Sequence, residues 1–155
     1  MNTHELCNTI RERLEYEFRD VQLPSEGRGE RAAPAVINSY LPPKRSIRPD
    51  ADTDFPFVLV RPVRGRSTID GSSVTVRLIV GVRNESRDDG VTSMLLIKDI
   101  ILAALFRAPR HGVFTFEQTA EWVNFDDQQE PFYELWIDTD WSMYHPQLEG
   151  DGDER

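Results

Sequence analysis

Only one pair of reactive side chains in this sequence has a spacing that would bring two groups together. Asp138 and Asp140 lie two residues apart in an alternating segment, so both carboxylates would project from one face of a strand. Such a pair can bind a cation or act as general acid and base. Because no phosphate-binding or glycan-handling motif accompanies the two aspartates, the sequence favours ordinary solvated charge over catalysis.

The other residues that could do chemistry are scattered. His4, His111 and His145 fall on three different predicted elements, without a second ligand at metal-binding spacing. The Ser72-Ser73 pair lacks the G-x-S-x-G context of a catalytic serine. We therefore expect no catalytic residue, no metal and no cofactor.

Composition narrows the function classes further. The 155 residues include 27 acidic and 18 basic side chains, and the net charge of −9 argues against a protein that grips nucleic acid through a concentrated basic face. The longest apolar run, Ile100 to Phe106, is much shorter than the ~20 residues that cross a bilayer, so we expect no membrane contact. The single cysteine excludes an intramolecular disulfide. The length predicts one domain, over residues 1–146.

Residues 3–19 are predicted to form an amphipathic helix. Apolar side chains recur every four residues and would bury one stripe against a sheet: Leu6, Ile10, Leu14 and Phe18. Cys7 lies beside this stripe, where a thiol packs as a small hydrophobic group. Asn2 or Thr3 is expected to cap the first turn.

The segment 22–54 has no sustained periodicity and holds five of the ten prolines. A connection of this length is usually functional or disordered. We interpret it as a proline-rich arm, either a flexible loop or a segment that orders only against a neighbouring subunit. Within it, Ala35–Leu41 could form a short strand or a turn. The acidic residues 147–155 are predicted to be a disordered tail.

Two hairpins with a helix between them are predicted from residue 55 onward. The first joins Phe55–Gly65 to Ser73–Asn84 through an extended loop at 64–72, and the last joins Val113–Val123 to Phe132–Tyr144. The fold class is therefore α+β: an antiparallel or mixed four-stranded sheet packed by the N-terminal helix and a central helix.

The prolines and the central helix give two further expectations. Pro56 and Pro62 place the first strand of the sheet at an edge. The central helix, Val91–Phe106, is apolar around much of its circumference and should form the centre of the core, with Leu95 and Leu102 buried.

Aromatic and arginine side chains on the solvated faces are the candidate interface residues. Trp136 and Tyr144 interrupt the polar side of the last strand, which indicates either an interface or simple cross-strand packing. Basic residues of the arm and of the first hairpin complete the set: Lys44, Arg45, Arg48, Arg61, Arg64 and Arg66.

The order of these elements, with a few short signatures, resembles the tail terminator or tail completion proteins of long-tailed phages. The resemblance runs from Phe55 to Trp141 and rests on four segments: PFVLVRPVRG, SSVTVRLIVGVRN, the helix start GVTSMLL, and EPFYELWIDTDW. It implies a small α+β subunit of a hexameric ring. Such a ring caps the finished tail tube, offers a docking face to the head–tail connector or stopper protein, and lets DNA pass without specific binding.

The resemblance also implies a location in the virion tail or neck, and in the host cytoplasm during assembly. Other functions remain open at this point. The chain could be a different head–tail connector, such as a stopper or a tail-tube-like subunit, although the loops 64–72 and 124–131 look short for a tube protein. It could also be a small non-viral binding domain or enzyme with a pocket near Asp138 and Asp140.

Overall fold

The computed structural model describes residues 2–24, 31–40 and 55–144. The helices are α1 (Thr3–Phe18) and α2 (Arg87–Arg107). The strands are β1 (Leu23–Pro24), β2 (Arg31–Ala32), β3 (Ala35–Asn38), β4 (Phe57–Ser67), β5 (Gly71–Arg83), β6 (Arg110–His111), β7 (Phe114–Asn124) and β8 (Phe132–Tyr144).

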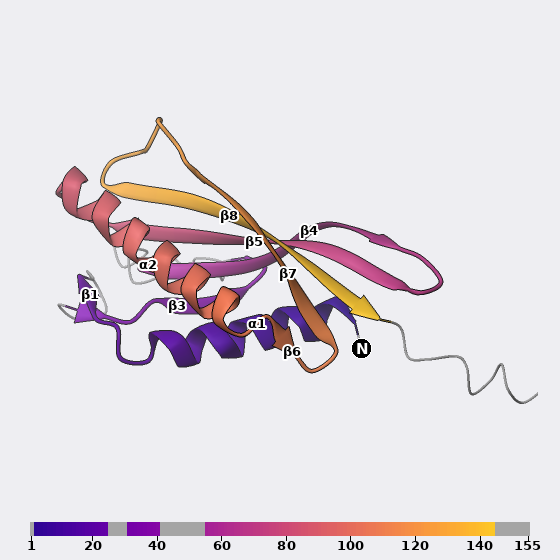
Figure 1. The fold of residues 1–155 in the computed structure, drawn as a ribbon. Coiled ribbons are helices and arrows are strands. Elements are labelled where there is room, and N and C mark those ends of the chain that lie inside the picture. Colours follow the sequence, from indigo (N-terminus) through magenta and orange to yellow (C-terminus); the bar gives the residue numbers. More distant parts are fainter. Residues whose placement is uncertain (1, 25–30, 41–54, 145–155) are drawn as a thin grey trace, which may run out of the picture.

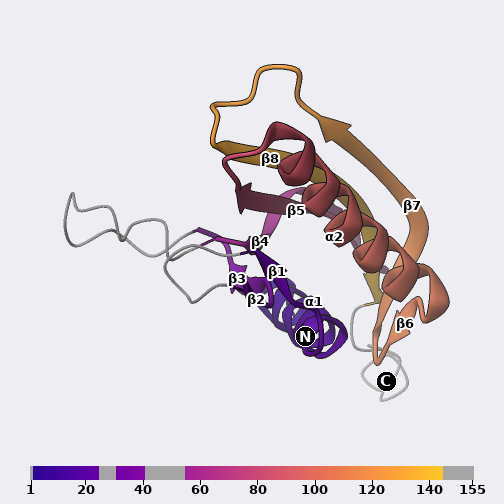
Figure 2. The ribbon, with the colours of Figure 1, turned by 90° about the vertical axis from the view of Figure 1, so that its left-hand side faces the viewer.

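The described chain is an α+β protein with one curled, mixed sheet of six strands (Figure 1). The strand order is β3-β4-β5-β8-β7-β6, and β1 pairs with β2 in a separate small sheet. Both helices pack on the same side of the large sheet, α1 on β3 and β4 and α2 on β5, β8 and β7 (Figure 2). We call this side the helix face and the opposite side the open face. The predicted α+β class is confirmed.

The predicted count of four strands is wrong because two short strands extend the edges. β3 joins β4 in parallel, and β6 joins β7. β4 is therefore not an edge strand over Phe57–Val60, contrary to the expectation from the prolines. Pairing of β4 with β3 ends at Val60, two residues before Pro62. No described strand pairs with the outer edge of β4 at Pro62, so the missing N–H of this proline interrupts no hydrogen bonds on that edge. Within the described part of the predicted arm, β3 thus pairs with the chain's own sheet, and β1 pairs with β2.

Both helices begin at a capping side chain. The Asn2 side chain accepts a hydrogen bond from the Glu5 N–H at 2.8 Å, and Ser86 Oγ accepts one from the Asp89 N–H at 3.3 Å. Asp88 and Asp89 then lie in the first turn of α2, where their charge is favourable to the helix dipole. α2 consequently starts four residues earlier than the predicted Val91.

The core lies between the helices and the helix face of the sheet. α1 contributes the predicted stripe, and α2 contributes side chains that are fully buried: Met94, Ile97, Ile101, Ala104 and Leu105. Leu95 and Leu102 are only partly buried, so their predicted central place is wrong. The α2 sequence is apolar on several sides of the helix. The side that is buried is determined by the contacts of α2 with the sheet and with α1.

The first hairpin is longer than predicted. β4 continues to Ser67 and β5 begins at Gly71, so only Thr68–Asp70 lie outside the strands and the expected extended loop is not present. The far end of this hairpin projects beyond the helices (Figure 1). One extra residue, Val63, interrupts the pairing as a β-bulge between Pro62 and Arg64.

The second hairpin matches its prediction in both strands and carries its own irregularity. The register of β7 against β8 shifts between Phe116 and Ala120, and Gln118 in this bulge has a φ of 59°. The left-handed backbone is uncommon for a residue with a side chain, and such bulges strengthen the local twist. The sheet as a whole is curled (Figure 1).

Candidate assembly interface

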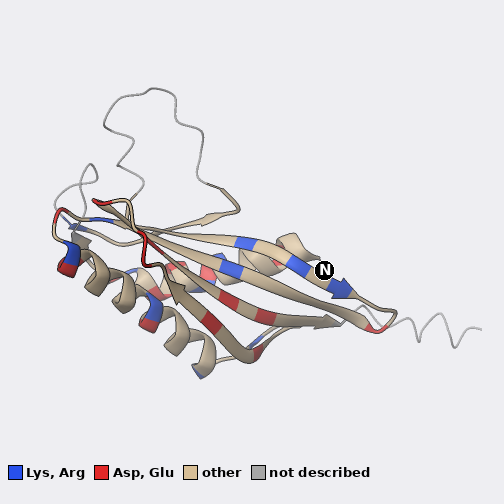
Figure 3. Ribbon diagram, turned by 90° about the horizontal axis from the view of Figure 1, so that it is seen from above, with Lys and Arg blue, Asp and Glu red and all other residues tan. Residues whose placement is uncertain are grey.

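Four charged side chains form a row across the middle of the open face. The register pairs Arg61 with Arg77, Arg77 with Asp138, and Asp138 with Glu121, on the adjacent strands β4, β5, β8 and β7. The row therefore reads base, base, acid, acid (Figure 3). We call it the charge row. It makes one side of the open face positive and the other negative.

Only the central pair of the charge row is an ion pair. Arg77 donates from Nε and Nη2 to the two carboxylate oxygens of Asp138, at 2.8 and 3.2 Å. The Arg77 guanidinium also lies 4.1 Å from the centre of the Trp136 ring, and its bonds to Asp138 raise its pKa. These contacts neutralise the centre of the face and leave the charge at its two sides.

The basic side of the open face is extended by the bulge. Arg64 and Arg66 pair with Thr75 and Ser73, which are on the open face, and both arginines are exposed. If Val63 paired regularly with Thr75 instead of bulging, Arg64 and Arg66 would point toward the helix face, because side chains alternate along a strand. Arg61, Arg64 and Arg66 therefore lie on one face of β4.

The acidic side consists of β8 and β7. Beyond the charge row, Thr75 Oγ1 donates to Asp140 at 2.8 Å, and the Ser142 hydroxyl donates to Glu117 in the β7 bulge. Glu121, at the outer end of the charge row, is exposed and makes no ion pair among the described residues. Like charges on Glu121 and Asp138 face each other directly, which is unfavourable unless a cation lies nearby.

Two strand edges on opposite sides of the sheet are unpaired by any described strand. On β4, pairing with β3 ends at Val60, so Pro62–Ser67 has a free outer edge. On β7, pairing with β6 covers only Phe114 and Thr115, so Glu117–Asn124 has a second free outer edge among the described strands. Free edges can add a strand from another chain. One edge lies on the basic side and the other on the acidic side.

The open face also carries an aromatic groove, which we define by its lining residues Phe55, Phe57, Phe125, Phe132 and Trp136. It encloses about 680 Å³ at the start of β4, beside the loop that joins β7 to β8. The rings contact each other: Phe55 is 5.0 Å from Phe57 and 5.3 Å from Phe132, and Phe125 is 5.0 Å from Trp136. Asp126, Asp127 and Glu134 add carboxylates to the lining.

Gln128 holds the wall of the aromatic groove in place. Its Nε2 donates to the carbonyls of Phe125 and Glu134, at 3.0 and 2.9 Å, and its Oε1 accepts from the Glu134 N–H at 2.9 Å. The loop over residues 125–131 is thereby fixed to the start of β8. A groove whose wall is fixed by such bonds is largely formed before a partner arrives.

The candidate interface residues fall into three groups. Arg61, Arg64 and Arg66 share the open face with Trp136. Tyr144 is the last residue of β8, paired with Gly71. Lys44, Arg45 and Arg48 lie outside the described residues, as does the predicted acidic tail.

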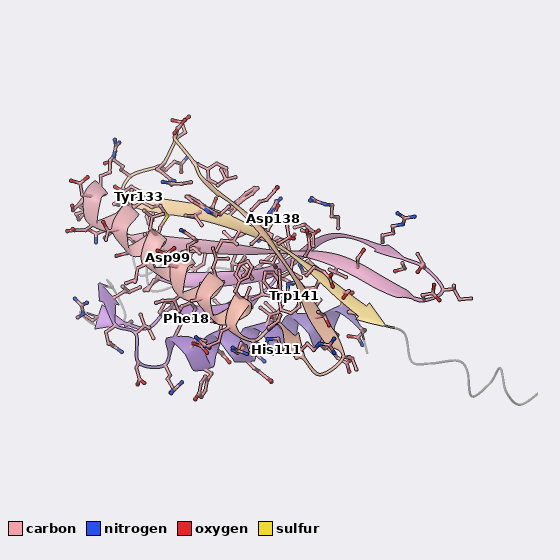
Figure 4. The ribbon with its side chains drawn as sticks, in the orientation of Figure 1. Phe18, Asp99, His111, Tyr133, Asp138 and Trp141 are labelled. Carbon is pink, nitrogen blue, oxygen red and sulfur yellow. The ribbon has the colours of Figure 1, made fainter. Side chains whose placement is uncertain are left out.

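The residues considered for chemistry either bind other side chains of the protein or lie far from one another. Asp138 is bound by Arg77 and Asp140 by Thr75. His111 contacts Arg13 on the opposite side of the sheet, near Trp141 (Figure 4). Within the described ranges, no three His, Cys, Asp or Glu side chains form a group that could hold a metal.

Cys7 is buried beside the helix stripe, and burial raises the pKa of its thiol to about 11. Neither described helix is long and apolar enough to cross a membrane.

Sequence reasoning missed the acidic half of the interface and the groove. Glu121 looked like ordinary surface charge because nothing local aligns it with Asp138. Phe125 and Gln128 belong to a turn-rich stretch that carries no periodic signal. The alternation of β8 was the one usable clue, since it put Glu134, Trp136 and Asp138 on the same face.

No protein-family model matches this sequence, and comparison with curated proteins gives no match.

Proposed function

We propose that this protein is the subunit of a homo-oligomeric ring that caps a phage tail tube and joins it to the head connector. The charge row carries the proposal. A face that is basic along β4 and acidic along β7 is complementary to itself when copies pack head to tail. Head-to-tail contacts between identical subunits close into rings when the rotation permits. The phage assignment rests on the resemblance of residues 55–141, and six copies is the number that the resemblance implies.

Two other properties are compatible with a neck ring. Among the described residues, Asp138 is bound by Arg77 and Asp140 by Thr75. This is compatible with a protein that acts by binding partners through its surface. A net charge of −9 per subunit gives a wall to which DNA would not adhere, because like charges repel. DNA would then pass through the ring without specific binding.

The test is assembly in the presence of tail tubes. Trp136→Ala with Arg64→Glu removes an aromatic and an arginine, the residue types that dominate interface energies. We expect a folded protein, judged by circular dichroism, that no longer caps tubes. Electron microscopy of particles made with this variant should find tubes of irregular length or tails without heads. Normal joined virions would refute the assignment of this face.

A tail-tube-like subunit is the second candidate, because the β4–β5 hairpin is long. Its strands of 11 and 13 residues project past the helices, as a strand shared between stacked or neighbouring subunits would require. The loop length had counted against this function, and that objection is now removed. Sedimentation at increasing concentration separates the candidates: a tube subunit grows into long polymers, whereas a terminator stops at one ring.

A further inference from the structure

We propose that the aromatic groove of one copy binds the segment Leu41–Pro49 of a second copy. This inference rests on the proposed function in requiring that copies of the chain pack head to tail. The groove is apolar at its base and acidic at its wall, and none of its lining residues is Lys or Arg. Its volume of about 680 Å³ suits a short extended peptide, being within the range of ordinary binding pockets.

The sequence of the segment is complementary to the groove. Leu41–Pro49 reads LPPKRSIRP and combines three prolines with Lys44, Arg45 and Arg48. Proline-rich peptides bind aromatic-lined grooves, and prolines lower the entropy lost on binding. Lys and Arg also bind favourably over aromatic rings and beside carboxylates. Asp126 and Asp127 are exposed and make no ion pair among the described residues, so their charge is available.

The occupant is assigned to a second copy on the basis of head-to-tail packing. In the sequence, Leu41–Pro49 connects β3 to β4, at one edge of the sheet. Asp126 and Asp127 belong to the loop that joins β7 to β8, toward the other edge, while Phe55 and Phe57 at the start of β4 line the same groove. Head-to-tail packing brings the β4 side of one copy against the β7 side of the next, and so brings the segment of the first copy toward the acidic wall of the second. The second experiment below separates this arrangement from a segment that binds the groove of its own chain.

Trp136 provides a separate indication that the groove lacks a component. Its Nε1 is buried, and no acceptor for it is present among the described residues. A buried N–H without an acceptor is unfavourable, because it has lost its hydrogen bond to water. A peptide carbonyl brought to the groove is a suitable acceptor, since an extended proline-rich backbone leaves its carbonyls free.

The first experiment measures binding of a synthetic Leu41–Pro49 peptide by calorimetry. The receptor is the full chain with Lys44→Glu, Arg45→Glu and Arg48→Glu, so that its own segment does not compete. We expect saturable binding that weakens at least tenfold when Asp126→Asn and Asp127→Asn are added. Asp20→Asn with Asp70→Asn changes the charge equally at exposed positions and should leave the affinity unchanged. Absent binding, or equal weakening by both pairs, overturns the proposal.

The second experiment distinguishes a second copy from the same chain. The wall variant (Asp126→Lys, Asp127→Lys) retains a normal segment, and the segment variant (Lys44→Glu, Arg45→Glu, Arg48→Glu) retains a normal groove. Both variants also carry Arg64→Glu, which weakens the proposed contact of the charge row. Native mass spectrometry should then detect dimers in the mixture and only monomers of each variant alone. If the peptide binds but no heterodimer appears, the segment occupies its own groove and the proposal is wrong. Because peptide binding needs no ring, a failure of ring formation alone would instead count against the proposed function.

Discussion

The ring of Phe57 lies directly over Gly81 on the neighbouring strand. A Cβ at Gly81 would come within 2.2 Å of Phe57 Cζ, so any other residue there must displace the ring. Phe57 and Gly81 are cross-strand partners, and both line the aromatic groove. The absent side chain at position 81 is therefore what gives Phe57 its place at the base of the groove.

Gly81→Ala should destabilise the protein and alter the groove together. Overpacking of this kind costs about 1–3 kcal/mol. In a protein of this size each kcal/mol lowers the melting temperature by roughly 2–4 °C. Thermal denaturation followed by circular dichroism measures the loss, and Ser73→Ala, at an exposed position of the same strand, should change it little. An unchanged melting temperature for Gly81→Ala would mean that Phe57 moves without cost.

Ile101→Ala should be among the most damaging changes in α2. The Ile101 side chain is fully buried between the sheet and α1, and its truncation leaves a cavity that costs about 2–5 kcal/mol. Leu96, on the same helix, is 45% exposed, and Leu96→Ala should cost less than about 0.5 kcal/mol. Urea denaturation gives both values. Similar losses for the two variants would show that the orientation of α2 is wrong.

Acidification should destabilise the protein through His111. Burial lowers the pKa of His111 below its ordinary value of 6.5, and the Arg13 guanidinium beside it acts in the same direction. The unfolded chain then binds a proton more readily than the folded one, so stability is full above about pH 6.5 and falls as the pH drops toward the lowered pKa.

His111→Gln should reduce that loss, whereas His4→Gln, at an exposed position, should retain it. Denaturation midpoints measured between pH 7.5 and 5 check this. A parent protein and a His111→Gln variant with parallel pH profiles would contradict the role of His111.

Charge reversal at either side of the open face should weaken self-association. Arg64 makes no ion pair among the described residues, so Arg64→Glu should disturb the contact between copies and leave the fold intact. Glu121→Arg should act alike, and the two changes combined should restore part of the association. Analytical ultracentrifugation measures the constants. Salt near 1 M should weaken the parent assembly, because it screens charges beyond about 3 Å. Additive losses in the double variant would exclude a direct contact.

The Cys7 thiol should be inert in the folded protein. It is 4% exposed, and its pKa of about 11 keeps it protonated at pH 8. A thiol-specific chromogenic reagent should therefore react only after denaturant is added, since the thiolate is the reactive form. Fast reaction of the native protein would mean that α1 detaches from the sheet.

The elements with strong periodicity were predictable from sequence. α1, β5 and the β7–β8 hairpin follow from apolar spacing that local sequence alone determines. The strand β3 was expected only as one alternative to a turn, because four residues carry little pattern. Its parallel pairing with β4 depends on contacts between segments separated by the intervening chain. The predicted burial of Leu95 and Leu102 was wrong for a related reason. An apolar helix has several faces that could be buried, and its contacts with the sheet determine which one is.

The placement of the candidate interface residues was predictable only by residue type. Arginines and Trp136 were expected on a solvated face, and they lie there. The charge row was not, because Arg61, Arg77, Asp138 and Glu121 come from four strands whose alignment depends on hairpin register. Register is a property of the folded sheet, and bulges change it without a consistent sequence signal.

The bulge at Val63 makes the polarity of this surface a matter of strand register as well as composition. If Val63 paired regularly with Thr75, every arginine would remain in the sequence. Arg64 and Arg66 would nevertheless move to the side of the sheet where the helices pack, and Arg61 would be the one arginine of β4 left on the other side. The same sequence could therefore present two different surfaces to a neighbour, depending only on how β4 is paired with β5. For this protein, the bulge between Pro62 and Arg64 determines the basic side as much as the arginines themselves.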